Sequence, residues 1–313
     1  MKIYVLINSK VLTGGPKALL QLGGALSKSG ADVSLVFPDS STIKIFESWM
    51  TDFCPEAEAC VLEHLLAVKG VTIVIPETGI KESLSIVDSS CNKVWLYMLS
   101  VDNAQIRGIA TGSLLRNIFL RLRNRNSMSL GEIAEHVSLV LTQSRYSEDL
   151  LSGADIPYYY VGDYIDQEFD LAPPQKPRCG IVTNGNKGGF FKFLIRFFYP
   201  SLRITELKGV APSDVPSFLK SHELYLDLGG QPGKDRLPRE CLKLGVPVLL
   251  LTRGAAKNGS DFPYVKASKL PLRGLLNLKS HLKKAKTVDL NVYQTHLKAE
   301  REEFHLRVSK LVE

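Results

Sequence analysis

The sequence predicts an α/β protein made of two domains, each built on a parallel β-sheet. Apolar runs of strand length alternate with segments whose apolar residues recur at helical spacing, and this order continues along most of the chain. Such an order is typical of parallel sheets, because parallel strands need a crossover connection. A chain of 313 residues with 44% hydrophobic and 23% charged residues can form two cores and is neither disordered nor collagen-like.

The first elements have the order of a Rossmann-like unit. We expect a buried strand at Lys2–Asn8, a polar loop with Gly14 and Gly15, a helix at Lys17–Ser29 and a strand at Ala31–Phe37. The glycine pair lacks the Gly-x-Gly-x-x-Gly spacing, which excludes a dinucleotide fingerprint. It is either a ligand-facing loop or a tight turn without a ligand.

Further strands continue the first domain. The pattern predicts a helix at Glu56–Lys69 and strands at Val71–Ile75, Lys93–Leu99 and Val137–Thr142. Polar residues beyond the carboxyl end of a parallel strand lie where open α/β sheets bind ligands. Asp102, just after one of these strands, is therefore a candidate for meeting an acceptor hydroxyl, and an Asx cap is the alternative.

A basic, apolar segment interrupts this alternation at Ile106–Asn126. Four arginines (Arg116, Arg121, Arg123 and Arg125) are interleaved there with leucine, isoleucine and phenylalanine. Such a segment can lie against a membrane or accept a lipid-linked substrate. A surface helix with snorkelling arginines is the alternative.

Proline density marks the boundary between the domains. The segment Tyr158–Pro177 contains three closely spaced prolines at its end and predicts a linker. We place the boundary near residue 172. The expected domains are residues 1–172, residues 173–289 and a final helix at residues 290–313.

The second domain restarts the alternation. We expect a strand at Cys179–Thr183, a glycine-rich loop at Asn184–Gly189, a strand at Ile204–Leu207 and a helix at Ser213–Lys220. The run Phe190–Tyr199, FFKFLIRFFY, is typical of a core helix, and docking on a membrane is the alternative.

The chain is organised around the stretch His222–Leu251, HELYLDLGGQPGKDRLPRECLKLGVPVLLL. It predicts a strand at Glu223–Leu228, a helix at Leu237–Leu244 with Pro238 near its start, and a strand at Pro247–Leu251. The intervening turn carries glycines and charged residues, namely Gly229, Gly230, Gly233, Lys234, Asp235 and Arg236, and Arg239 follows in the helix. Backbone N–H groups and cations at a helix N-terminus favour an anion such as phosphate. A basic, solvated turn is the alternative.

A basic helix at Leu275–Lys286 and a last amphipathic helix complete the prediction. Residues on one face of that last helix are apolar: Leu290, Tyr293, Leu297, Phe304, Val308 and Leu311.

Charge is divided unequally between the halves. Residues 1–170 hold 14 Lys+Arg and 20 Asp+Glu, a balance of −6, whereas residues 171–313 hold 25 and 12, a balance of +13. A basic half favours phosphate or an anionic membrane, and no RNA-binding motif is present.

Several classes of protein are excluded or disfavoured. The five scattered cysteines form no Cys-x-x-Cys pair, and the six histidines show no metal-ligand spacing, so we expect reduced thiols and no metal site. No apolar run approaches the roughly 20 residues of a membrane span. Polar residues from Asn8 on interrupt the apolar start, so we expect no secretory signal. We therefore expect a cytoplasmic location.

The run PGKDRLPREC followed by LGVPVLL resembles the donor-site segment of GT-B glycosyltransferases. The form Pro-Gly-Lys-Asp-Arg-x-Pro-Arg-Glu is similar to a sub-family among bacterial surface-polysaccharide glycosyltransferases. The resemblance implies the GT-B fold: two Rossmann-like domains facing each other across a cleft, with a C-terminal helix that crosses back to the N-terminal domain. It also implies that the loop with Gly14 and Gly15 faces that cleft on the acceptor side.

The resemblance implies site residues as well. Glu240 matches the second of two family glutamates and would contact the donor ribose, whereas the first falls on Pro232. Lys187 matches a lysine that touches the donor diphosphate, and Lys234 and Arg236 would also stabilise it. The absence of an Asp-x-Asp motif predicts catalysis without a metal ion, in which positive groups stabilise the leaving diphosphate.

The expected function is transfer of a sugar from a nucleotide diphosphate sugar, as co-substrate and without a cofactor, to a hydroxyl of a glycan or glycolipid. The expected partners are the nucleotide sugar, a glycan or lipid-linked acceptor and, peripherally, an anionic membrane, with no nucleic acid. Three alternatives stay open: a nucleotide-sugar epimerase of the same fold, a catalytically inactive interaction protein and a two-lobed solute-binding receptor. Fold alone does not separate them.

Overall fold

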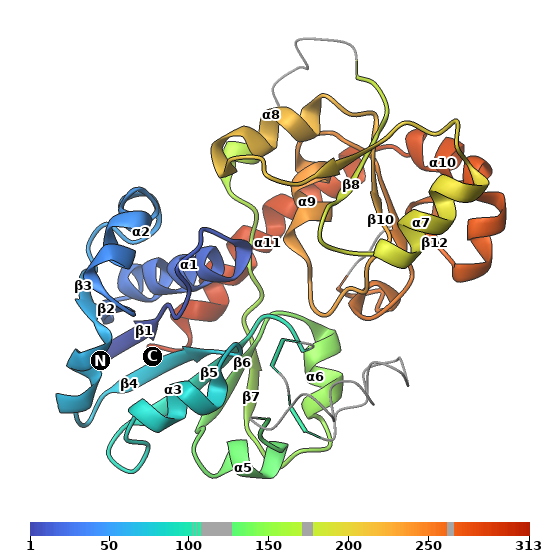
Figure 1. Cartoon of the computed structure of the whole chain (residues 1–313). Helices are drawn as coiled ribbons and strands as arrows, with labels where there is room; N and C mark the ends of the chain where they lie inside the picture. The colour runs from blue at the N-terminus through green and yellow to red at the C-terminus, as the bar shows by residue number, and fades with distance from the viewer. Residues whose placement is uncertain (102, 105, 108–126, 171–177, 262–265) are drawn as a thin grey trace. The chain divides into compact units, whose positions relative to one another are not determined.

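A computed structural model describes the chain except residues 102, 105, 108–126, 171–177 and 262–265 (Figure 1). Two units are present. Unit 1 consists of Met1–Asp163 and Glu302–Glu313, and unit 2 of Tyr164–Arg301. The division after Asp163 differs from the prediction near residue 172, which falls among residues outside the described part.

Unit 1 contains a seven-stranded sheet in the order β3-β2-β1-β4-β5-β6-β7, and all its neighbouring strands are parallel. The strands are β1 (Lys2–Leu6), β2 (Asp32–Phe37), β3 (Glu58–Val61), β4 (Thr72–Pro76), β5 (Lys93–Met98), β6 (Leu139–Thr142) and β7 (Tyr158–Tyr160). The helices are α1 (Gly14–Lys28), α2 (Ser40–Phe53), α3 (Ile80–Ile86), α5 (Leu130–Ala134) and α6 (Arg145–Leu151). The central strands are buried on both faces, which explains their near-continuous apolar sequences.

Three predicted elements of unit 1 were wrong. The helix expected at Glu56–Lys69 is instead the edge strand β3 followed by a 3-10 helix, Leu62–Ala67. Tyr158–Tyr160, expected in the linker, pairs with β6 as the edge strand β7. Gly14 and Gly15, expected in a loop, begin α1.

Unit 2 contains a five-stranded parallel sheet in the order β12-β11-β10-β8-β9. Its strands are β8 (Ile181–Asn184), β9 (Ile204–Leu207), β10 (Leu224–Asp227), β11 (Val248–Leu251) and β12 (Lys269–Leu270). Its helices are α7 (Gly189–Phe198), α8 (Val215–Lys220), α9 (Arg236–Lys243) and α10 (Leu278–Lys286), and η6 (Leu272–Asn277) is a 3-10 helix before α10. If the strands are numbered 1 to 5 in chain order, their order across the sheet is 2-1-3-4-5, the flavodoxin-like arrangement of doubly wound folds.

The last helix, α11 (Asn291–Ser309), belongs to unit 2 as far as Arg301 and to unit 1 from Glu302 on. Within unit 1, the Arg307 guanidinium donates to the Tyr160 carbonyl at 3.3 Å, and the Tyr159 hydroxyl donates to the Arg307 carbonyl at 3.3 Å. Four of the six residues predicted on its apolar face are buried: Tyr293, Leu297, Phe304 and Val308. No described helix is both long enough and apolar enough to span a bilayer.

Candidate functional site in unit 2

The residues predicted to bind a donor lie at the carboxyl ends of β8 and β10. From β8 the chain continues to β9, toward one edge of the sheet. From β10 it continues to β11, toward the opposite edge, so the strand order reverses between the neighbours β8 and β10. Open α/β sheets bind ligands at this switch point. The loop after β8 contains Lys187, and the loop after β10 contains Gly229 to Asp235.

Glycines allow these two loops to touch. Gly188 has a φ of +69°, and a Cβ on it would lie 2.7 Å from the Leu228 Cβ. A Cβ on Gly229 would lie 2.9 Å from the Lys187 Cβ. Side chains at either position would force the loops apart, because real Cβ atoms are not found so close to other heavy atoms. The glycines therefore determine the distance between the two loops.

The backbone N–H groups of the turn are only partly available to a ligand. The Gly229 N–H, predicted to face the donor, donates to Asp227 Oδ1 at 2.8 Å. Among the described residues, the N–H groups of Gly230 and Gly233 have no acceptor. A Cβ on Gly230 would meet nothing within 4 Å, so space is open at this point of the turn.

Lys187 reaches the beginning of α9. Its ammonium contacts the carboxylate of Asp235, which immediately precedes that helix, and the Lys187 side chain is 32% exposed. Burial raises the pKa of Asp235 to about 6, with a further contribution from the Asp227 charge, although Lys187 opposes this rise. The structure thus brings together two of the predicted donor residues, although 48 positions separate them.

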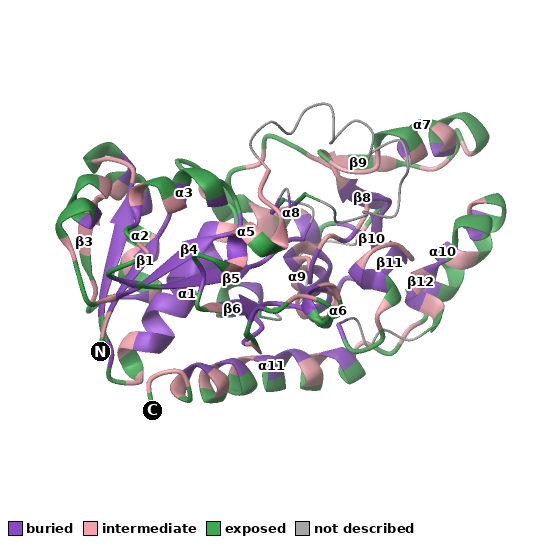
Figure 2. Ribbon diagram, turned by 90° about the horizontal axis from the view of Figure 1, so that it is seen from below, coloured by how far each residue is buried: buried purple, intermediate pink, exposed green. Residues whose placement is uncertain are grey.

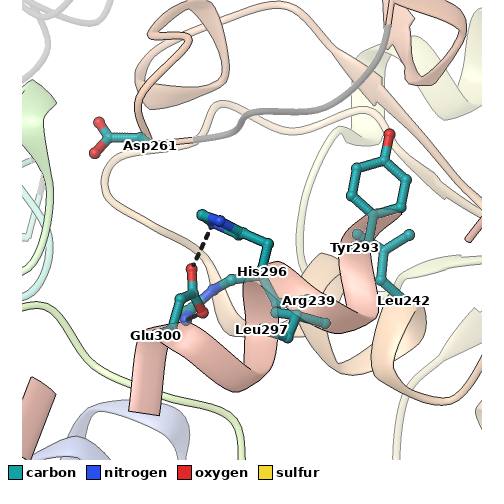
Figure 3. A pocket seen from close by; sticks show the side chains of 7 residues that line it. All are labelled: Arg239, Leu242, Asp261, Tyr293, His296, Leu297 and Glu300. Carbon is teal, nitrogen blue, oxygen red and sulfur yellow. Dashed lines mark hydrogen bonds and ion pairs between the residues drawn. The ribbon is translucent and has the colours of Figure 1, made fainter. Parts of the chain in front are cut away.

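Lys234 is buried in an ion-pair network rather than directed at solvent. Its ammonium contacts Glu300 of α11, and the Arg239 guanidinium lies 3.1 Å from the other oxygen of that carboxylate. Burial alone would raise the pKa of Glu300, but the charges of Lys234 and Arg239 hold it well below its usual range. Next to this network lies a cavity of about 10 Å³ that Arg239, His296 and Glu300 help to line (Figure 3). This volume is about that needed by one water molecule.

Arg236 and Glu240 lie one helical turn apart on α9. The Arg236 guanidinium is 3.2 Å from Asp166 Oδ2 and 3.5 Å from Glu240 Oε1, and its side chain is buried. An anion that binds Arg236 therefore has to compete with these carboxylates.

Carboxylates outnumber the cations around the turn, which the sequence did not predict. Four cations (Lys187, Lys234, Arg236 and Arg239) are accompanied by five carboxylates (Asp166, Asp227, Asp235, Glu240 and Glu300). The sequence shows the cations because they are adjacent, whereas Asp166 and Glu300 come from distant parts of the chain.

Gln231 is a residue that sequence reasoning missed. Its side chain is fully buried in the turn, and neither amide atom has a hydrogen-bond partner among the described residues. The backbone around it is tightly held: the Gln231 carbonyl accepts from Ala255 N at 2.7 Å, and a Cβ on Gly254 would lie 2.1 Å from that oxygen. A buried amide without partners costs about 1–3 kcal/mol, so a ligand that satisfies it would gain affinity. In the sequence, only the position of Gln231 inside the GGQPGK run could have marked it as a candidate site residue.

Unit 1 places a second set of polar residues at the carboxyl edge of its own sheet. Its switch point lies between β1 and β4, and Glu77 directly follows β4. The Glu77 side chain is buried, and its carboxylate accepts from the Leu99 N–H at 3.4 Å. Burial raises the pKa of Glu77 to about 7, although the backbone N–H groups of Glu77 and Leu99 oppose this rise. Gly15 lies at this edge too, since a Cβ on it would be 3.9 Å from the Leu99 side chain.

Sequence reasoning selected Asp102 and overlooked Glu77, although both follow apolar strands. Asp102 lies outside the described residues, as do Arg116, Arg121, Arg123 and Arg125. Among the described residues, no group of three or more His, Cys, Asp or Glu side chains is arranged to hold a metal ion. Metal-independent catalysis stays a prediction.

No protein-family model matches this sequence, and no curated protein is similar to it. Solved structures are similar in fold. A glycosyltransferase from Rickettsia africae ESF-5 has a TM-score of 0.61 and 11% identity, over 99% of this chain and 96% of that one. LpCGTa in complex with UDP has a TM-score of 0.60 and 12% identity, over 99% and 98%. The UDP-GlcNAc 2-epimerase from Neisseria meningitidis, bound to UDP-GlcNAc, has a TM-score of 0.50 and 10% identity, over 100% and 98%. At these identities the likeness concerns the fold, and the chain has the GT-B fold.

Proposed function

We propose that this protein is a GT-B glycosyltransferase of the bacterial surface-polysaccharide type, which moves a sugar from a nucleotide diphosphate sugar to a hydroxyl of a glycan or glycolipid. The observation that carries the proposal is the pair of touching loops at the switch point of unit 2, where Lys187 reaches the N-terminal end of α9. Neighbours of the same fold, solved with UDP and UDP-GlcNAc, support a nucleotide sugar as partner.

Binding of the diphosphate would exchange one ion pair for another. Lys187 is the most accessible cation of the turn, and a diphosphate would replace Asp235 as its partner. The N–H groups of Gly230 and Gly233 would donate to the phosphate oxygens, and the N-terminal end of α9 adds a favourable dipole. Glu240 would accept from the ribose hydroxyls, and Arg236 would hold that carboxylate in place and exchange Asp166 for an oxygen of the diphosphate.

Catalysis would consist of positioning the reactants and stabilising the leaving diphosphate, without a metal ion. Two carboxyl groups are candidates for the proton acceptor on the acceptor side. Asp102 is the candidate from the sequence, and Glu77, with a pKa of about 7, is suited to accept a proton near neutral pH.

Titration of UDP, GDP and ADP into Arg236→Ala tests the donor site. We expect binding weaker by roughly 1.5–3 kcal/mol, the range for a charge-assisted hydrogen bond. Arg203→Ala, which removes an exposed arginine of the same unit, is the control and should bind as the wild type does. Equal affinities of the two variants for all three nucleotides would contradict the donor assignment.

Turnover measurements separate the remaining possibilities. If Asp102 or Glu77 accepts the proton, its change to the amide should lower transfer by about 10²- to 10⁴-fold and leave nucleotide affinity unchanged. Full activity in EDTA is expected. Epimerisation of the sugar of a nucleotide sugar in the absence of an acceptor would favour the epimerase. Nucleotide binding without any turnover would favour an inactive interaction protein in which Pro232 replaces the first family glutamate.

A further inference from the structure

Helix α7 has its apolar side exposed and a lysine buried. Four of its phenylalanines (Phe190, Phe193, Phe197 and Phe198) are between 65% and 70% exposed. On the opposite side Lys192 is buried, and its ammonium donates to the Asn184 carbonyl at 3.2 Å and to the Gly185 carbonyl at 2.9 Å. These bonds hold the helix in this orientation. An ordinary surface helix has the opposite arrangement, so the exposed phenylalanines need a function.

The exposed apolar side continues onto η6. The Tyr199 hydroxyl, just after α7, bonds the carbonyl oxygens of Leu275 and Leu276 at 2.9 and 2.8 Å, which fixes the two segments side by side. Leu276 is 81% exposed and Leu272 is also exposed. Between them lies a hollow of about 470 Å³, lined mainly by apolar residues of α7 and η6. We call the surface formed by α7, η6 and the following helix α10 the aromatic face. Figure 2 shows exposed residues along both α7 and α10.

The two chain segments around this hollow carry cations and no carboxylate of their own, although Glu206 pairs with Lys192 and Arg196, and Glu223 pairs with Lys286. Residues 186–203 contain four Lys+Arg, residues 266–287 contain seven, and neither segment contains an Asp or Glu. Lys279, Lys283 and Lys284 of α10 are exposed, and no carboxylate among the described residues pairs with them. Large apolar side chains beside unpaired lysines are typical of surfaces that bind anionic bilayers, where the rings enter the interface and the cations meet headgroups.

We propose that the aromatic face docks on an anionic lipid bilayer, with the phenylalanines of α7 in the acyl boundary and the lysines of α10 at the headgroups. A second copy of the chain is a less favourable occupant, because a two-fold contact would bring two such cationic surfaces together. The proposal concerns attachment to a membrane and does not depend on the transferase activity.

Flotation of the full-length protein with vesicles tests the proposal. The probes are phosphatidylcholine vesicles with 30% phosphatidylserine and vesicles of phosphatidylcholine alone. We expect binding to the anionic vesicles at low salt, weaker binding at high salt, and little binding to the neutral ones. Equal binding to both compositions, or binding to neither, would overturn the proposal.

Matched variants locate the contact. Phe193→Ser with Phe197→Ser should lower vesicle binding by at least about tenfold, since both rings leave water on docking. Lys283→Gln with Lys284→Gln should lower it by roughly fivefold per lysine. Leu66→Ser, which removes an apolar side chain of unit 1 that is 69% exposed, is the control and should bind as the wild type does. Because all these side chains are exposed, the variants should keep the fold, which circular dichroism checks.

Sedimentation velocity without lipid tests whether a second copy of the chain binds the aromatic face instead of a membrane. The protein is expected to stay monomeric over the concentrations used for flotation. A dimer that the Phe193→Ser/Phe197→Ser variant abolishes, together with no vesicle binding, would assign the face to a second copy. Vesicle binding that survives the phenylalanine and lysine variants would place the membrane contact elsewhere and overturn the proposal.

Discussion

The buried carboxyl group of Glu77 should make the stability of unit 1 depend on pH. Its pKa is raised from the ordinary 4.5 to about 7, and its side chain is only 4% exposed. Below pH 4.5 the group is protonated in both the folded and the unfolded chain, so it has no effect. Between pH 4.5 and 7 the unfolded chain releases the proton and the folded chain keeps it, so stability falls as the pH rises. At 1.36 kcal/mol for each pKa unit, the loss between pH 4.5 and 8 is about 3 kcal/mol.

Glu77→Gln removes this titration and nearly keeps the shape of the side chain. The difference in unfolding free energy between variant and wild type should therefore become about 3 kcal/mol more favourable to the variant from pH 4.5 to pH 8. Any constant cost of the amide cancels in this comparison.

Urea unfolding followed by tryptophan fluorescence measures this quantity. Both tryptophans, Trp49 and Trp95, lie in unit 1, so the signal reports on that unit. Glu135→Gln, which removes an exposed carboxylate of the same unit, is the control and should change stability little at either pH. A variant-to-wild-type difference that is the same at pH 4.5 and pH 8 would refute the raised pKa, and with it the suitability of Glu77 as a base near neutral pH.

Two further predictions concern unit 2. Glu300→Gln leaves the buried Lys234 without its charged partner and should lower the unfolding free energy by about 3–5 kcal/mol in urea unfolding followed by circular dichroism; a loss below about 1 kcal/mol would show that the network is solvated. Gly188→Ala should cost stability and weaken nucleotide binding, because its Cβ would push the two loops apart. Gly209→Ala is the matched control: it has the same φ of +69° but open space around it, so it should cost only about 1–2 kcal/mol of backbone strain. Equal nucleotide affinities of these two glycine variants would show that the loop contact does not shape the site.

The fold was predictable because it depends on local apolar pattern. The central strand and helix were predicted at Glu223–Leu228 and Leu237–Leu244 and lie at Leu224–Asp227 and Arg236–Lys243. Turn glycines and Pro238 mark these ends in the sequence itself. The segment Glu56–Lys69 was misassigned because its apolar residues have helical spacing, whereas its strand forms by pairing with β2, which local sequence does not encode.

The candidate site was predictable only in its members that are close in sequence. The turn glycines follow from strand–loop–helix order, whereas Lys187 was named only through the family resemblance, and its contact with Asp235, 48 positions away, was not predicted. The neutralisation of Lys234 by Glu300 did not follow, because 66 positions separate them and only folding brings them together. For Glu77 the missing information was burial, which decides its pKa and is not visible in a run such as Pro76-Glu77-Thr78.

These pairings change what the positive charge of the second half means. The sequence attributes the balance of +13 in residues 171–313 to a phosphate site, but every cation of the donor turn already has a carboxylate partner. A ligand there has to win by exchanging partners and by satisfying groups such as the Gln231 amide, so shape and hydrogen bonding decide affinity more than net charge. Three exposed lysines without a carboxylate partner among the described residues lie on α10, the helix that follows η6 in the aromatic face. Long-range attraction for anions should therefore act at the aromatic face, and raising the salt concentration should weaken vesicle binding much more than nucleotide binding.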